Sequence, residues 1–248
     1  MKIAVLTDVH GNLPALQVAL AAIDREGADV IYHTGDAIGI GPFPAECLEL
    51  LLSTARMKLI CGNHDAWFSS GLPVPQPMWM SDGEVKHQQW IHSCLDPTLR
   101  GTIGAWPYLI QEVIEGVRLS FLHYGLAPSQ QEFRSIISSP GAAELEEIFA
   151  GLQADLVFYG HDHASSDLQG IARYVNPGSL GCHTDPVARF AILECQSKSY
   201  ALRMVGVPYN DDALFRQFES RDVPERHFIY EAFFGGRNPL RHPGPNIL

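Results

Sequence analysis

The chain has 248 residues, a formal net charge of −11 and 46% hydrophobic residues, which is enough for one domain with a sizeable core. Charged residues make up only 18%, and no apolar run approaches the roughly 18 residues of a membrane-spanning helix, so the composition excludes both a disordered chain and a membrane protein. The acidic balance disfavours sequence-independent binding of nucleic acid, because the phosphate backbone is itself negative.

The first third of the chain alternates apolar runs with helical patterns. Strands are predicted at 2–8, 28–36 and 57–61, and helices at 13–27 and 44–55. Buried strands that alternate with helices predict a right-handed, largely parallel sheet with helices on its faces.

The pattern changes after the third strand. Residues 66–108 hold a cluster of prolines and a predicted helix at 82–95, and we interpret this stretch as a cap-like insert. Its tryptophans are expected to pack the insert against the sheet rather than to stack on a nucleobase. Strands at 108–114 and 117–124 flank Glu115-Gly116, a two-residue turn signal that predicts an antiparallel hairpin.

The last 110 or so residues mix short strands with short helices. A helix is predicted at 141–150, strands at 154–159, 173–175, 188–195 and 200–207, and two helices in a tail at 210–248. The last ten residues are expected to be mobile. These elements predict a single domain, 1–248, with two sheets rather than one.

The cysteines and the amino terminus indicate a reducing compartment. The five cysteines are odd in number and include no C-x-x-C pair, so they predict neither a disulfide framework nor a thiolate zinc site. The apolar stretch at the amino terminus is too short for a secretory signal and runs directly into a motif. We therefore expect a cytoplasmic protein.

Polar clusters follow five of the predicted strands. Because neighbouring strands of an α/β sheet run side by side, side chains at their carboxyl ends converge on one crevice. Taken singly, each cluster has an ordinary explanation as a turn, a cap or a buried core histidine, but together they predict a metal centre. The clusters are Asp8-Val9-His10, Gly35-Asp36, Gly62-Asn63-His64-Asp65, His123 and Gly160-His161-Asp162-His163.

The residue types suit a pair of cations. The two oxygens of Asp36 can bridge ions that lie about 3.5–4 Å apart, and Asn63 adds a neutral oxygen. His161 and His163 are two apart, and in an extended segment they would face the same way, holding either one ion or one each of a close pair. His64 is adjacent to these groups but free to act on a substrate.

In this order the clusters form the pattern D-x-H, G-D-x-x-G, G-N-H-D, H and G-H-x-H, which resembles the calcineurin-like metallophosphoesterase superfamily. The resemblance covers residues 1 to about 207, and a turn at 176–179, Asn-Pro-Gly-Ser, matches a further signature. The opening at 8–12 and the Gly39-Ile40-Gly41-Pro42 segment are similar to the bacterial and archaeal predicted phosphodiesterase branch. The family implies an α/β fold, a four-layer αββα sandwich of two mixed sheets flanked by helices.

The resemblance also implies roles for individual residues. His64 would protonate the leaving oxygen or stabilise the phosphoryl charge, and Asp65 would orient it. A metal-bridging hydroxide would attack phosphorus. The two implied ligand sets, which share Asp36 as the bridge, are Asp8, His10, Asp36 and His163 for one cation, and Asp36, Asn63, His123 and His161 for the other.

Several alternatives stay open at this point. Mixed imidazole, carboxylate and amide ligands suit Mn²⁺, the expected metal, but also Fe, Zn²⁺ or Ni²⁺. The expected substrate is a small phosphodiester, including nucleotides, while a phosphomonoesterase, a protein phosphatase, a non-catalytic scaffold of the same fold and a single-strand nuclease are alternatives. His183, just beyond the 176–179 turn, is interpreted as a surface loop histidine rather than a substrate contact.

Overall fold

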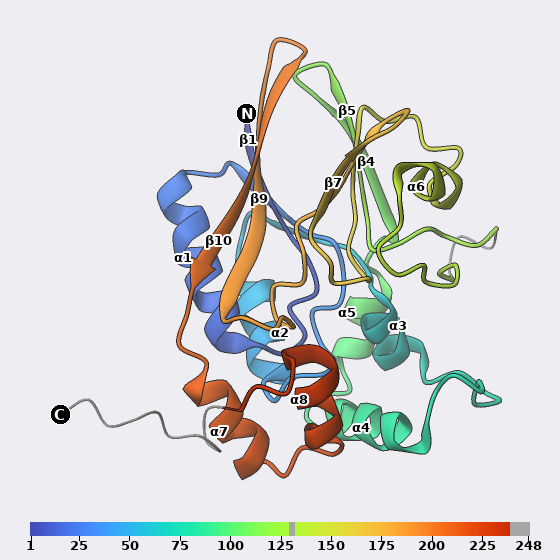
Figure 1. Ribbon diagram of the computed structural model, residues 1–248, viewed down its shortest axis with the longest axis vertical. Helices are drawn as coiled ribbons and strands as arrows, with labels where there is room; N and C mark the ends of the chain where they lie inside the picture. The colour runs from blue at the N-terminus through green and yellow to red at the C-terminus, as the bar shows by residue number, and fades with distance from the viewer. Residues whose placement is uncertain (129–131, 239–248) are drawn as a thin grey trace.

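The structure is a computed structural model that describes residues 1–128 and 132–238 (Figure 1). Its centre is a pair of five-stranded sheets. The first sheet has the order β10-β9-β1-β2-β3. Its strands are β1 (Lys2–Leu6), β2 (Val30–His33), β3 (Met57–Leu59), β9 (Val187–Gln196) and β10 (Ser199–Pro208). Strands β1, β2 and β3 are parallel, whereas β9 is antiparallel to both β1 and β10.

The second sheet has the order β4-β5-β6-β8-β7. Its strands are β4 (Leu109–Ile114), β5 (Val117–Leu122), β6 (Leu156–Phe158), β7 (Ser166–Gln169) and β8 (Arg173–Asn176). The predicted hairpin is confirmed, because β4 and β5 pair antiparallel and Ile114 lies opposite Val117. Strands β5, β6 and β8 are parallel to one another, so this sheet is also mixed.

Aromatic and aliphatic side chains from the two sheets form one shared core. The ring of Tyr32 stacks on that of Phe121 at a centroid distance of 3.7 Å, and Phe121 stacks on Phe158 at 5.4 Å. Ile3 and Val5 of β1 belong to the same fully buried cluster. The inner faces of both sheets are therefore dry, which explains why their strands are apolar in sequence.

Helices cover the two outer faces and complete the four layers. Helices α1 (Leu13–Glu26) and α2 (Pro44–Ser53) pack their apolar stripes against the first sheet, and α6 (Ala142–Ile148) packs against the second. Helix α1 begins where the Asn12 side chain accepts a hydrogen bond from the backbone of Ala15, and it ends at Gly27, which has left-handed backbone. The predicted αββα sandwich is thus confirmed.

The remaining helices lie beyond the sheets, at the end where β1 finishes (Figure 1). The segment between β3 and β4, which includes the predicted insert at 66–108, contains α3 (Asn63–Ser70), α4 (Asp82–Ser93) and α5 (Leu99–Gly104). The segment after β10 forms α7 (Asp212–Ser220) and α8 (Arg226–Phe234), whose apolar side chains make a cluster of their own with Ile40 and Cys182. The predicted helix at 82–95 and the two tail helices are therefore present.

The three strands predicted in the first third of the chain are parallel as expected, and β9 returns from the far end of the sequence to pair antiparallel with β1, which makes the first sheet mixed. Strand β7 has the polar sequence Ser-Asp-Leu-Gln and was not predicted, since it lies at the edge of its sheet and only alternate residues are covered. The predicted mobility of the last ten residues concerns 239–248, which lie outside the described residues.

Across residues 1–128 and 132–238, none of the helices combines the length and the apolar character that crossing a membrane would require. All five cysteines are free thiols, and four of them are buried, as expected from their number and spacing.

The shared core between the sheets gives a stability prediction. Phe121→Ala should lower the free energy of unfolding by about 3–5 kcal/mol, because it removes a fully buried ring that stacks on two others. Urea unfolding followed by circular dichroism measures the change. Val113→Ala on β4 is the matched control, since the Val113 side chain is 69% exposed and should change stability by less than about 0.5 kcal/mol. Equal effects of the two substitutions would contradict the packing described.

Candidate metal centre

All of the predicted ligands lie just beyond strand ends and meet at one place. Asp8 and His10 follow β1, Asp36 follows β2, Asn63 and His64 begin α3 after β3, His123 follows β5, and His161 and His163 follow β6. Backbone hydrogen bonds hold the loops together, with the amide of Asp8 donating to the carbonyl of Gly35 and the amide of His10 to that of Asp36, both at 3.0 Å. Parallel strands therefore bring remote residues together as predicted.

One half of the cluster is built around His10. Its Nε2 atom lies 2.9 Å from Nε2 of His163, 3.6 Å from Oδ1 of Asp8 and 3.7 Å from Oδ2 of Asp36. Oδ1 of Asp8 is also 3.5 Å from Nε2 of His163. These are the four residues that the family resemblance implies as the first ligand set.

The other half is built around His123. Its Nε2 atom lies 3.1 Å from Oδ1 of Asn63, 3.1 Å from Nδ1 of His161 and 3.3 Å from Oδ2 of Asp36. The carboxylate of Asp36 thus faces both halves, as the resemblance implies for a bridge. The arrangement brings the predicted residues together, while their function as ligands stays a prediction.

Hydrogen bonds to backbone carbonyls assign the tautomers of the two central histidines. Nδ1 of His10 donates to the carbonyl of Ile38 at 3.3 Å, and Nδ1 of His123 donates to that of Thr34 at 3.0 Å. In the neutral rings Nε2 therefore carries a lone pair that faces other acceptors. When both rings are deprotonated, these acceptor atoms lie about 3 Å apart and repel one another, so this set of ligand atoms fits divalent cations.

The backbone at the cluster is strained in the same way at five of these residues. Their φ angles lie in the left-handed region, which residues other than glycine seldom adopt. The angles are 51° at Asp8, 44° at His10, 58° at Asp36, 74° at His161 and 60° at His163. The chain therefore turns at 161–163 instead of being extended, and the two histidines contact different halves of the cluster, which agrees with the alternative of one histidine for each of a close pair of ions.

Two glycines permit the close packing of these loops. A Cβ atom on Gly62 would lie 2.2 Å from Oδ1 of Asp36, and one on Gly160 would lie 2.0 Å from Oγ1 of Thr7 and 2.4 Å from Oδ2 of Asp8. Neither space could hold a side chain without displacing a carboxylate of the cluster. The glycines in the G-N-H-D and G-H-x-H segments are thus required sterically.

The charges of the cluster balance one another. Burial opposes ionisation of Asp8 and Asp36, but the neighbouring imidazoles His10 and His123 hold the pKa of both carboxyl groups below their usual range. Burial likewise opposes protonation of His123, but Asp36 raises its pKa to about 9. Burial dominates at His161 and lowers its pKa to about 4. A cation entering the site would compete with the protons on His10 and His123.

The Asp65 carboxylate fastens the loops rather than the ring of His64. It accepts hydrogen bonds from the backbone amides of Asp36 at 2.8 Å, Ala37 at 3.1 Å and Gly62 at 3.0 Å. No hydrogen bond between Asp65 and His64 occurs in the described part of the chain. The expectation that Asp65 orients His64 is therefore corrected, and its contacts assign Asp65 to shaping the loop that carries Asp36.

Gln88 of α4 holds the position that was expected of Asp65. Its Nε2 atom lies 2.9 Å from Nδ1 of His64, and the ring of His64 meets that of His10 edge-on at a centroid distance of 5.1 Å. Burial lowers the pKa of His64 to about 3. A neutral ring that accepts at Nδ1 carries its proton on Nε2, so His64 can donate a hydrogen bond from that atom.

Aromatic rings contact three of the histidines at the site. The indole of Trp67 lies 4.7 Å from the ring of His64 and stacks in turn on Trp79 at 6.1 Å. Phe133 contacts His123 at 5.3 Å, and Phe233 of α8 contacts His163 at 5.7 Å. Trp79 is 65% exposed, so the expectation that the tryptophans of the insert pack inward fails at this residue, although Trp106 is buried.

Hydrogen bonds from the 176–179 turn hold the backbone at two of the candidate ligands. The Ser179 hydroxyl donates to the carbonyl of Asp8 at 2.9 Å, and the amide of Ser179 donates to the carbonyl of His163 at 3.0 Å. His183 is paired with Asp185 at 2.6 Å and is about one-third exposed, in line with a surface loop histidine. The buried thiol of Cys182 lies close to His10 and His163.

Sequence reasoning missed two supporting residues. Thr7 donates from its hydroxyl to Oδ2 of Asp8 at 2.6 Å, and its place directly before the first motif is a signal that could have been used. Gln88 lies in the insert, 24 residues from His64, and no motif marks it.

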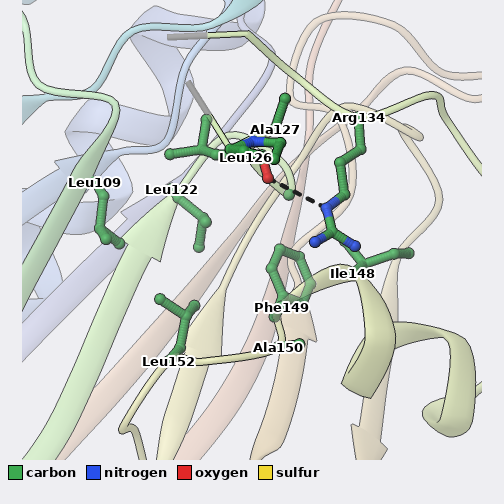
Figure 2. A pocket seen from close by; sticks show the side chains of 11 residues that line it. Leu109, Leu122, Leu126, Ala127, Arg134, Ile148, Phe149, Ala150 and Leu152 are labelled. Carbon is green, nitrogen blue, oxygen red and sulfur yellow. Dashed lines mark hydrogen bonds between the residues drawn. The ribbon is translucent and has the colours of Figure 1, made fainter. Parts of the chain in front are cut away.

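A cavity of about 230 Å³ lies apart from the cluster, between α6 and the loop that follows β5 (Figure 2). Its walls are mainly apolar, and Arg134 closes one side by donating from Nε to the carbonyl of Leu126 at 3.1 Å. The described residues that line it include none of the candidate ligands. The cavity is therefore separate from the chemistry of the site.

Comparison with known proteins finds a relative in sequence and solved structures of similar fold. The chain is 25% identical to the uncharacterized protein MJ0912 of Methanocaldococcus jannaschii. The alignment is 252 residues long and covers 95% of this chain and 98% of that protein. The fold is similar to that of hypothetical protein PH1004 from Pyrococcus horikoshii OT3, with a TM-score of 0.78, 21% identity and coverage of 96% and 99% of the two chains. A metallophosphoesterase from Sphaerobacter thermophilus gives a TM-score of 0.69, 23% identity and coverage of 91% and 96%.

The family model for the calcineurin-like phosphoesterase superfamily domain matches residues 1–198. That span contains every one of the clusters that follow the strands, from Asp8 to His163, together with the supporting turn at 176–179. The chain therefore belongs to the calcineurin-like phosphoesterase superfamily and is a metal-dependent phosphoester hydrolase.

Proposed function

We propose that the protein is a binuclear phosphodiesterase that acts on a small organic phosphate ester. The observation that carries this proposal is the position of Asp36, whose carboxylate lies within 3.7 Å of His10 and within 3.3 Å of His123. A single carboxylate between two groups of imidazoles is the arrangement by which a protein holds a pair of cations close together.

The residues divide naturally between two ions, for which Mn²⁺ is our proposal. Asp8, His10 and His163 would hold one, Asn63, His123 and His161 the other, and Asp36 both. When bound, such ions acidify water and neutralise charge on phosphoryl oxygens. Only two of the seven side chains are formally charged, so the site would keep a net positive charge for an anionic ester within a protein of net charge −11.

The chain itself would contribute a hydrogen-bond donor and an organic binding surface. His64, held through Nδ1, directs its Nε2 proton toward a phosphoryl or leaving-group oxygen, which stabilises the charge that develops there. Trp67 and Trp79 extend from His64 to the solvent and offer aromatic faces to the organic part of a substrate, including a nucleobase. The net negative charge favours such small esters over nucleic acid polymers.

Four buried free cysteines also support a reducing location such as the cytoplasm, which forms part of the same proposal.

Hydrolysis of bis-p-nitrophenyl phosphate, compared with the monoester p-nitrophenyl phosphate, tests the reaction class. We expect the manganese-loaded protein to have the higher kcat/KM on the diester. Activity on the monoester alone would overturn the diesterase proposal in favour of a phosphomonoesterase. Failure to hydrolyse either ester or a panel of nucleotide diesters would favour a metal-binding scaffold of the same fold.

Substitutions in the two halves should affect metal content differently. His163→Ala removes a ligand of one half, and we expect it to leave about one firmly bound ion per chain, whereas Asp36→Asn weakens both halves and should leave less than one. Elemental analysis after dialysis measures the content. Asp167→Asn, which disrupts a surface ion pair with Arg173, is the control and should keep about two ions. Equal losses in His163→Ala and Asp36→Asn would refute a shared carboxylate.

His64→Ala should lower turnover about 10²–10⁴-fold while both ions stay bound, because the ring acts on the substrate rather than on the metals. Steady-state kinetics and elemental analysis on the same preparation measure the two quantities. His183→Ala is the control, since that side chain is paired with Asp185 and should leave the rate unchanged. An undiminished rate in His64→Ala would remove His64 from the mechanism.

A further inference from the structure

We propose that Gln88 is a positioning residue for His64: its side-chain amide donates to Nδ1 of the imidazole and so holds the ring in the tautomer that carries its proton on Nε2. The inference rests on the proposed function only for its kinetic readout. It also assigns a role at the site to the insert at 66–108, for which the sequence predicted none.

The contact is short and buried. Nε2 of Gln88 lies 2.9 Å from Nδ1 of His64, and Gln88 is 1% exposed. His64 itself has little room to move, because Gly39 lies so close that a Cβ atom there would come within 2.6 Å of Nδ1. Trp67 contacts the ring on another side, at 4.7 Å between centroids. The amide therefore meets a ring whose plane is already restricted.

The other end of the amide has no partner, which makes a packing role unconvincing. Oε1 of Gln88 is buried and accepts no hydrogen bond from the described residues. A buried amide with an unsatisfied oxygen costs about 1–3 kcal/mol, whereas leucine would fill a similar volume at no such cost. The contact that distinguishes glutamine from leucine at this position is the hydrogen bond to His64.

The helix that carries Gln88 is anchored independently of that bond. Helix α4 begins at Ser81, whose hydroxyl accepts from the backbone of Glu84 at 3.0 Å. Nδ1 of His87 donates to the carbonyl of Pro224 at 3.0 Å, and Ile91 is fully buried. Loss of the Gln88 amide should therefore leave α4 in place. A substitution at Gln88 then reports on the hydrogen bond to His64 rather than on the position of the helix.

The chemical consequence follows from the tautomer. A neutral imidazole has one N–H, and the donor on Gln88 requires Nδ1 to be the acceptor. The remaining N–H is then on Nε2, where it can stabilise negative charge on the substrate in the transition state. Without the amide, the ring could place its proton on Nδ1 and present a lone pair to an anionic substrate, which repels it.

The first test reads the tautomer directly. In zinc-loaded protein labelled with ¹⁵N-histidine, the His64 signal, identified by its absence in His64→Ala, should show the Nε2–H tautomer. In Gln88→Leu the signal should shift toward the Nδ1–H tautomer, whereas in Gln89→Leu it should not move. Gln89 is the adjacent residue on α4 and is exposed, so it controls for the substitution itself. An unchanged tautomer in Gln88→Leu would overturn the proposal.

The second test is a double-mutant cycle measured on the preferred ester. Gln88→Leu should lower kcat about 10–100-fold with little change in KM and with metal content unchanged, and Gln89→Leu should match the parent protein. Gln88→Leu combined with His64→Ala should be no slower than His64→Ala alone, because Gln88 acts through that ring. Losses that multiply, a loss of metal, or an unchanged kcat would each overturn the proposal.

The two tests separate this inference from the proposed function. If the parent protein hydrolyses no phosphoester, the proposed function fails, while the ¹⁵N signals still decide whether Gln88 sets the tautomer of His64.

Discussion

The Asp65 carboxylate is the constraint on which the rest of the site depends. It accepts backbone hydrogen bonds from the loop after β2 and from Gly62 at the start of α3, so it joins two segments that leave different strands. This bond network fixes the backbone of Asp36 in its left-handed conformation. Asp36 faces both His10 and His123. The position of Asp65 therefore determines whether both halves of the centre can contact the carboxylate of Asp36.

The same loops bring several acceptor atoms close together, and the neighbouring protein groups satisfy them poorly. The backbone carbonyls of Thr34 and Ile38 take up the Nδ1 protons of His123 and His10, which turns the other ring nitrogens toward carboxylate, amide and imidazole acceptors. Without a cation, protons shared with Asp8 and Asp36 balance the cluster. Bound cations would give the acceptors of the candidate ligands a partner, and coordination would offset the cost of the strained backbone. The loops that strain the backbone are therefore the same loops that form the candidate metal site.

The parts of this site that the sequence predicted are those that a strand places. Asp8, Asp36 and Asn63 follow parallel strands of the first sheet, and His123 and His161 follow parallel strands of the second. Because parallel strands of a sheet end on the same side, the sequence could predict that these residues gather at strand ends. The sequence could not predict the turn at 161–163, because nothing in a histidine marks a positive φ, nor the partner of His64, because Gln88 comes from a helix with no motif. Asp65 was identified but its role was misread, since the groups that donate to it are backbone amides up to 29 residues away, and backbone donors leave no pattern in the side-chain sequence.

The insert at 66–108 and the helix that leads into it carry the side chains to which the proposed function assigns contact with the substrate. Helix α3 supplies His64 and Trp67, α4 supplies Gln88, and the loop between these helices supplies the exposed Trp79. The candidate metal ligands, by contrast, lie on loops that follow strands of the two sheets, with Asn63 at the start of α3. A change of sequence within residues 66–108 can therefore alter the orientation of the donor and the surface offered to the organic part of an ester while leaving the metal loops intact. Under the proposed function, the residues that would hold the ions are not those that would meet the leaving group, so one metal centre could serve different esters.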